Sequence, residues 1–300
     1  MIRAFVSACL LAGFAALPAP AQQARDMAGA SNMMTELNAI QAANVIRRGR
    51  VVELGRDYRP DMPLDPADAF ALSKTRVDTG QVTRIESRPA APPGRAGTYL
   101  DGLGHLGRAG EDGAFYNGFT ADEVAPGDGP GKLGIEHVKP FFTRGILIDM
   151  VTVRGGPMAA GEEITVADIE TALDWFGMDA PGHGDAVIFH TGWGRHWIAD
   201  NATYLDGAPG IGMEAAEWLI ARKVALVGAD SWAIGVQAPG VAPRAFPVAL
   251  ELLAKHGIFL HRNLETERLI DAEISEFAYV FAPLPVVGAT GSPGAPLAVY

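Results

Sequence analysis

In the second half of the chain, short runs of apolar residues alternate regularly with stretches in which apolar residues recur at helical spacing. The clearest helix begins at Thr165, where Asp168 three residues later completes a capping box, and its apolar side chains lie on one face up to Gly177. Two further helices are predicted at 213–222 and 246–255, and strands at 186–191, 224–227, 258–260 and 276–281. Strands that alternate with helices in this way predict an α/β domain.

The first half of the chain is less regular. Its predicted elements are a helix at 27–48 that stops at Gly49, strands at 51–54 and 146–153, and strand-like pieces at 81–85 and 97–101. The stretch 55–134 is rich in Gly, Pro and Asp, so we expect long loops there and a closing loop at 288–294. Because no linker separates two cores, residues 50–300 are expected to form a single domain after a helical arm at 22–49.

Composition and charge limit the classes of protein to which this chain can belong. The 300 residues are 48% hydrophobic and 20% charged, which is typical of a folded globular chain. The net charge is −11, from 24 Lys and Arg against 35 Asp and Glu, so the average field of the protein repels phosphate backbones and anionic lipid. We therefore expect a small-molecule ligand and neither nucleic acid nor a membrane as partner.

Residues 1–21 have the pattern of a signal peptide. Arg3 gives a positive start, an apolar run follows, and Ala19-Pro20-Ala21 has the small-x-small form of a cleavage site. The pattern predicts an exported protein, periplasmic or secreted. The single cysteine, Cys9, lies inside this segment, so thiol catalysis and disulfides are not expected in the mature chain.

Common site motifs are incomplete. Residues 102–107 fit G-x-G-x-x-G, but no helix is expected to open on the last glycine. No serine stands in G-x-S-x-G, and the seven histidines form neither H-x-H nor H-E-x-x-H. Asp101 and His105 at one strand end and His190 at another are placed for chemistry, since strand ends in α/β sheets face the ligand crevice. A histidine held in a loop or core by a hydrogen bond is the alternative for each.

Seven short motifs, taken together and in order, resemble the putative cyclase family, whose relatives include bacterial kynurenine formamidase, isatin hydrolase and trans-dienelactone hydrolase. The motifs are 97–105, 116–118, 132–135, 143–149, 189–193, 228–232 and 288–293. The resemblance implies a swivelling β/β/α fold, a homodimer or larger homo-oligomer, and metal-dependent hydrolysis of a lactone or amide.

The metal motif of that family, H-x-G-T-H-x-D-x-P-x-H, is only partly present. Arg95 stands at the first His and Tyr99 at the second, whereas Asp101 and His105 match the family residues. The family also has a later His and Glu, and here Ala249 and Arg262 stand at those positions.

Arginine stays protonated and cannot ligate a metal, so these changes count against a metal site. We expect Arg95 or Arg262 to pair with Asp101 where relatives hold the ion. The cofactor is then none, or a weakly held zinc or manganese ion on Asp101, His105 and a further histidine, such as His190 or His261.

Two functions follow from the resemblance and the altered motif. The first is a hydrolase of a small cyclic amide, lactone or aryl-formamide, with His105 as general base, Asp101 as its positioning group, His190 as a further catalytic candidate and an arginine stabilising the oxyanion. The alternative is an inactive exported relative that binds a small carboxylate through the arginines.

Further residues are candidates for the substrate wall. They are Arg95, Tyr99, Arg262, Asp230, Ser231 and Trp193. Asp230 and Ser231 follow a predicted strand, where a turn-capping role is the alternative.

Overall fold

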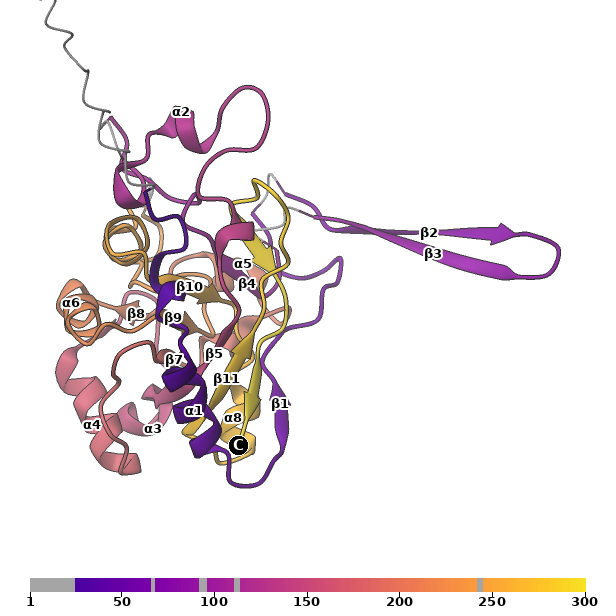
Figure 1. Ribbon diagram of the computed structural model, residues 1–300. Coiled ribbons are helices and arrows are strands. Elements are labelled where there is room, and N and C mark those ends of the chain that lie inside the picture. Colours follow the sequence, from indigo (N-terminus) through magenta and orange to yellow (C-terminus); the bar gives the residue numbers. More distant parts are fainter. Residues whose placement is uncertain (1–24, 66–67, 92–95, 111–113, 242–244) are drawn as a thin grey trace, which may run out of the picture.

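The computed structural model describes residues 25–65, 68–91, 96–110, 114–241 and 245–300. In this part of the chain a curled nine-stranded sheet runs through the body of the molecule, in the order β1-β13-β11-β5-β7-β9-β10-β4-β12 (Figure 1). Its strands are β1 (Val51–Glu53), β4 (Tyr99–Asp101), β5 (Phe141–Asp149), β7 (Ala186–His190), β9 (Leu226–Ala229), β10 (Phe259–Arg262), β11 (Glu276–Phe281), β12 (Gly291–Pro293) and β13 (Leu297–Val299). Neighbours from β5 to β10 are parallel and the other pairs are antiparallel. The predicted α/β class is confirmed.

Helices surround the sheet, and Figure 1 shows α3, α4 and α6 grouped on one side of it. The helices are α1 (Glu36–Val45), α2 (Ala121–Val124), α3 (Met150–Arg154), α4 (Val166–Phe176), α5 (Asn201–Leu205), α6 (Met213–Ala221), α7 (Pro247–Ala249), the π-helix η5 (Leu250–Lys255) and α8 (Glu267–Asp271). Short 3₁₀ turns are η1 (Gly29–Met33), η2 (Tyr116–Gly118), η3 (Ile135–His137) and η4 (Trp193–His196). Two small sheets pair β2 (Ala71–Asp78) with β3 (Thr83–Ala90), and β6 (Glu163–Ile164) with β8 (Gly210–Ile211).

The central strands are buried on both faces, as expected for parallel strands between covering layers. Every residue of β7 and β9 is buried. Gly228 in β9 is needed for this packing, because a Cβ there would lie 2.7 Å from side-chain atoms of both Ile188 and Leu264. On one side of these strands, α4 has the predicted capping box at Thr165 and ends at Gly177 in the left-handed conformation.

The predicted helix at 27–48 is wrong in extent. The 3₁₀ turn η1 comes first, and α1 begins only at Glu36. The chain breaks between them because Thr35 is extended and its hydroxyl caps α1 by accepting a hydrogen bond from Asn38 N. The cap that Thr35 provides thus outweighs the helical spacing of the apolar residues in 27–48.

The predicted strand at 146–153 is also wrong in part. Residues 141–149 form β5, but the chain turns into α3 directly afterwards. Asp149 starts this helix, since its carboxylate accepts a hydrogen bond from Thr152 N at 3.1 Å.

Two predicted loop regions contain strands. The stretch 55–134 includes the β2–β3 hairpin in place of a lone strand at 81–85, and the closing loop at 288–294 contains β12. A strand as short as β12 has no readable period of its own, and it forms because it pairs with β4, with Gly291 opposite Asp101. The predicted helix at 246–255 is a single α-turn, α7, followed by the π-helix η5.

The signal-peptide prediction for residues 1–21, including Cys9, lies outside the described residues. Within the described ranges, no helix combines the length and the apolar character needed to cross a membrane.

Candidate active site

Asp101 and Arg262 come from adjacent strands and form a buried ion pair. Strands β4 and β10 run antiparallel, with Leu260 opposite Asp101 and Arg262 opposite Tyr99. Arg262 Nη2 lies 2.5 Å from Asp101 Oδ2, the Asp101 side chain is fully buried, and the Arg262 side chain is 6% exposed. Opposite charges so close together and so far from water interact strongly. The expected pairing of an arginine with Asp101 is present, and Arg262 forms it.

Charge rather than well-directed hydrogen bonding holds this pair. Among the described residues, neither Asp101 oxygen accepts a well-aligned hydrogen bond and Arg262 Nε has no partner, while Arg262 Nη1 donates to Trp232 O at 3.1 Å. Burial by itself would lower the pKa of Arg262, but the Asp101 carboxylate raises it, and the pKa stays above its ordinary value. Arg262 is therefore charged over the whole physiological pH range.

His105 stands next to the pair in a tight turn. Its Nε2 lies 3.7 Å from Asp101 Oδ1, and its side chain is 18% exposed. The turn is closed by His105 N donating to Gly102 O at 2.9 Å. Gly102 has no room for a side chain, because a Cβ there would lie 2.8 Å from Thr290 O. The turn thus brings a partly exposed imidazole to a fully buried carboxylate.

The exposed side of this group opens into a cavity of about 790 Å³. Aromatic and polar side chains line it together, among them Tyr99, His105, Tyr204, Trp232, Phe246, Arg262 and Asn263. A cavity of this size, apolar with a few convergent polar groups, is typical of a small-molecule site.

A second cavity, of about 300 Å³, shares two of these side chains. Phe246 and Arg262 line both cavities, and Ala249 lines the smaller one. The position at which the family has its later histidine therefore borders the smaller cavity, on an α-turn that begins after Phe246.

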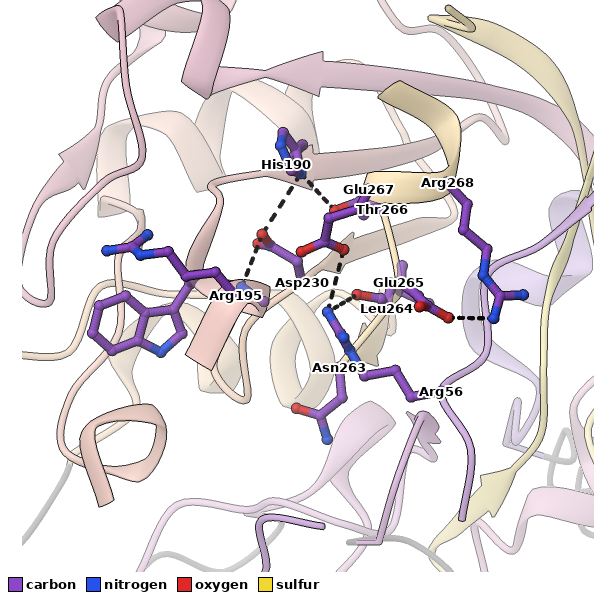
Figure 2. A network of polar contacts seen from close by, with 12 residues as sticks. Arg56, His190, Arg195, Asp230, Asn263, Leu264, Glu265, Thr266, Glu267 and Arg268 are labelled. Atoms are coloured by element: carbon purple, nitrogen blue, oxygen red, sulfur yellow. Dashed lines mark hydrogen bonds and ion pairs between the residues drawn. The ribbon is translucent and has the colours of Figure 1, made fainter. Parts of the chain in front are cut away.

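His190 and Asp230 lie in a different, buried network, which Figure 2 shows. Asp230 accepts hydrogen bonds from Thr191 N, Thr191 Oγ1 and Gly194 N, at 3.1, 2.6 and 3.3 Å. His190 Nδ1 is 2.7 Å from Thr266 Oγ1 and 3.7 Å from Asp230 Oδ2. Neither side chain is among those that line the cavities. Asp230 stabilises the turn after β7 through these hydrogen bonds, and the buried His190 lies next to Asp230.

Arg56 and Glu267 extend this network in Figure 2. Arg56 Nη2 donates to Leu264 O at 3.1 Å and lies 3.4 Å from Glu267 Oε2. Burial raises the pKa of Glu267 even though Arg56 acts to lower it. This network of charges ties α8 to the ends of β7 and β9; Asp230 and the Arg56 side chain are buried, whereas the Glu267 side chain is 38% exposed.

The other predicted wall residues lie in different places. Ser231 Oγ donates to Ala233 O at 2.6 Å, which is the turn-capping arrangement. Trp193 is buried and its Nε1 donates to Tyr204 O at 3.2 Å. Tyr99 lines the cavity, with the Arg262 guanidinium carbon 5.9 Å from its ring centroid. Arg95 lies outside the described residues.

Several wall residues could not be picked out from the sequence, among them Asn263, Tyr204 and Phe246. Asn263 Nδ2 donates to Gly97 O at 2.6 Å, and its Oδ1 accepts from Tyr204 OH at 2.8 Å. Asn263 follows Arg262 directly and has φ of 58°, a conformation that asparagine tolerates better than most residues. Its place in the Arg262-Asn263-Leu264 run was a usable signal, whereas nothing in the sequence pointed to Tyr204.

His261 faces away from this site, into the core. It is fully buried, its Nδ1 lies 2.5 Å from Tyr279 OH, and its Nε2 has no partner in the described part of the chain. Burial lowers the pKa of His261 to about 3, so its ring is neutral. Alternation along β10 separates it from Arg262, its neighbour in sequence.

The donors present do not fit the divalent ion that the resemblance implies. No three His, Cys, Asp or Glu side chains of the described residues gather where they could hold a metal ion. The fixed charge of Arg262 lies against the one carboxylate that keeps the family position. A site for zinc needs several deprotonated donors, and a guanidinium is never one.

A family model described as "Putative cyclase" matches residues 52–236, which is more than half of the chain. The chain belongs to the putative cyclase family. The family resemblance expected from the sequence motifs is thereby confirmed. A search of curated proteins finds no match.

Solved structures agree with this membership of the cyclase family. A crystal structure of a novel cyclase is 27% identical, with a TM-score of 0.80, and the match covers 92% of this chain and 96% of the other. Isatin hydrolase A from Ralstonia solanacearum is 24% identical at a TM-score of 0.61, over 88% and 97% of the two chains. Isatin hydrolase A from Labrenzia aggregata is 19% identical at a TM-score of 0.63, over 88% and 98%. The expected cyclase-like β/β/α fold is confirmed.

Proposed function

We propose that this protein is a hydrolase of a small cyclic amide, lactone or aryl-formamide, and that a fixed arginine takes the electrostatic role of a metal ion. The observation that carries the proposal is the arrangement of His105, Asp101 and Arg262 beside the 790 Å³ cavity. Membership of the cyclase family and the fold shared with isatin hydrolases support a hydrolytic reaction.

Each of the three groups has a role in acyl transfer. His105 takes a proton from water as the water oxygen bonds to the substrate carbonyl carbon. Asp101, 3.7 Å from the imidazole, favours the imidazolium that forms. Arg262 donates to the carbonyl oxygen as negative charge develops there. The imidazolium then gives its proton to the departing nitrogen or oxygen as the C–N or C–O bond breaks, which restores neutral His105.

The cavity wall supports an aromatic or flat cyclic substrate. Tyr99, Trp232 and Phe246 surround the position of Arg262, and Trp232 and Phe246 meet edge to face at 6.2 Å between ring centroids. Flat rings pack well against such walls, and the carbonyl of the ring is then within the reach of Arg262. Isatin is a substrate to test for this reason.

The test is hydrolysis of a panel of lactones, formyl-anilides and isatin, with EDTA or with added Mn²⁺. We expect turnover in EDTA, no stimulation by Mn²⁺, and a loss of about 10²- to 10⁴-fold in kcat/KM in His105→Ala. His137→Ala is the matched control, since His137 is a more exposed histidine that pairs with Glu136. Turnover that needs Mn²⁺, together with stoichiometric bound metal, would show the arginine account to be wrong.

The second candidate is an exported protein that binds a small carboxylate without turnover. The observation in its favour is a buried arginine whose Nε has no hydrogen-bond partner in the described chain. Arginine binds carboxylates through two parallel N–H groups. Inactivity on the whole panel, combined with a rise in Tm on adding benzoate that Arg262→Met abolishes, would favour this candidate.

A further inference from the structure

The smaller cavity, of about 300 Å³, adjoins the candidate active site, and the proposed reaction does not use it. It shares Phe246 and Arg262 with the large cavity. Because the Arg262 guanidinium belongs to both walls, a carbonyl group that it binds lies where the two cavities meet. The carbonyl carbon of an amide or ester carries two substituents, so each cavity has room for one of them.

One wall of the smaller cavity is a loop that backbone hydrogen bonds hold in place. Residues 233–237 form this wall, directly after Trp232, which lines the large cavity. Ile211 N donates to Ile234 O at 3.0 Å, and Val236 N donates to Ile211 O at 3.1 Å. The wall therefore has its shape before any ligand binds, as is usual for small-molecule sites.

A second wall is formed by helix α7 and the residue before it. Phe246 has φ of 47° and ψ of 46°, a left-handed conformation that aromatic residues rarely adopt. Its ring packs edge to face on Trp232, which fixes it between the two cavities. Strain of this kind persists where the surrounding packing imposes it, and it is concentrated at ligand sites.

The interior of the smaller cavity is apolar. Ile234, Val248 and Ala249 line it and are at most 5% exposed, and Ala249 contributes only a methyl group. An apolar cavity of about 150 Å³ is large enough for benzene, so this cavity has room for an alkyl chain of about six to eight carbons. Such a chain gains free energy by leaving water.

Two carboxylates mark the open side of the smaller cavity. Glu163 and Glu214 line it, and both residues are exposed. The chain as a whole is also acidic, with a net charge of −11. A substituent that points from Arg262 towards these carboxylates is therefore favoured when its far end is uncharged.

We propose that the smaller cavity is an acyl subsite, which takes an uncharged alkyl or phenylalkyl chain of up to about eight carbons on the substrate carbonyl. The aromatic amine or alcohol part then lies in the large cavity. This inference rests on the proposed function, because it takes Arg262 as the group that binds the carbonyl oxygen. It extends the substrates from formyl groups to longer acyl groups: water cleaves the C–N or C–O bond and yields the alkyl carboxylic acid and the arylamine or phenol.

Dissociation constants of N-phenyl alkanamides test the subsite without requiring turnover. Formanilide, acetanilide, butyranilide and hexananilide share the ring and the carbonyl and differ only in the acyl chain. Tryptophan fluorescence reports their binding, since Trp232 lines the large cavity. We expect the dissociation constant to fall about two- to fourfold for each added methylene. A terminal carboxylate on the hexanoyl chain should raise the dissociation constant about tenfold or more.

Two pairs of variants assign this binding to the smaller cavity. Ala249→Leu narrows it and should abolish the fall in dissociation constant beyond acetanilide, whereas Ala254→Leu, beside a different cavity, should retain the fall. Met213 is 37% exposed and lines the smaller cavity, so Met213→Glu decides the question if Ala249→Leu does not fold. It should weaken hexananilide binding about tenfold. Leu37→Glu, at an exposed position in the first turn of α1, should change it by less than about twofold.

The outcomes separate the acyl subsite from the proposed function. The subsite is overturned if the parent protein binds no anilide, if its dissociation constants do not fall with chain length, or if the fall persists in Ala249→Leu and Met213→Glu. A fall that these variants remove, together with no hydrolysis of any compound tested, supports the subsite and contradicts the proposed hydrolase. Hydrolysis without any dependence of binding on chain length contradicts the subsite alone.

Discussion

Two buried aspartates in this protein have very different surroundings. Asp230 accepts hydrogen bonds from three donor groups, Thr191 N, Thr191 Oγ1 and Gly194 N, and it lines neither of the two cavities described above. Asp101 is as deeply buried, but in the described chain its oxygens receive no well-aligned donor, and only the charge of Arg262 offsets its own. A carboxylate whose oxygens accept well-aligned hydrogen bonds stabilises the fold. A carboxylate without such donors, next to a cavity, retains the capacity to assist chemistry.

The largest effect on stability is expected from breaking the charge pair. Arg262→Met leaves the Asp101 carboxylate buried without a counter-charge, which should lower the free energy of unfolding at pH 7 by about 3–5 kcal/mol. The double variant Arg262→Met/Asp101→Asn should regain most of the loss. Urea denaturation of the parent and both variants measures this. Equal stability of the single and double variants would show that charge does not hold the pair.

A smaller loss of stability is expected when Asp230 is replaced. Asp230→Ala removes the acceptor for three donor groups and should cost about 2–3 kcal/mol in the free energy of unfolding. Asp230→Asn keeps one acceptor oxygen and should cost less than Asp230→Ala. If the two variants were equally destabilised, the charge of Asp230 rather than its hydrogen bonds would be what matters.

A third buried group, His261, should give the protein an acid-sensitive step. Its pKa is lowered from 6.5 to about 3 in the folded chain, so the unfolded chain takes up a proton first as the pH falls. Stability that is present above pH 6.5 is thus lost progressively as the pH falls towards 3. We expect this residue to account for about 2 kcal/mol between pH 7 and pH 5. His261→Gln, which cannot titrate there, should show a correspondingly flatter decrease, and an unchanged slope would contradict the assignment.

The smallest effect is expected at Ser231, next to Asp230. Its hydroxyl donates to Ala233 O, and Ser231→Ala should cost about 1 kcal/mol in the free energy of unfolding. Thermal unfolding detects a change of this size. A stability equal to that of the parent would mean that another donor, such as water, replaces the hydroxyl.

Elements with their own local signals could be predicted from the sequence. The capping box at Thr165 predicts helix α4, and β11 spans the predicted range 276–281. Strands β2 and β12 could not be predicted, because pairing partners rather than internal periodicity stabilise them. The break before α1 depends on one hydroxyl, that of Thr35, which competes with an otherwise helical pattern.

The site was predictable only where a known pattern marked its residues. Arg262 and Asp101 could be paired in advance because they stand at positions where the family has metal ligands. Tyr204 and Phe246 could not be found, since the folding of distant segments brings them to the same cavity. His190 and Asp230 share the strand-end placement of a site residue, but the hydrogen bonds that tie them to Thr266 and Thr191 cannot be read from spacing.

The positive charge beside Asp101 is covalently part of the polypeptide. A loosely bound ion depends on its concentration in the surrounding solution, and a competing chelator can remove it. The Arg262 guanidinium is present in every newly made molecule and stays there for the life of the protein. A protein built in this way keeps its electrostatic centre in surroundings that are starved of transition metals.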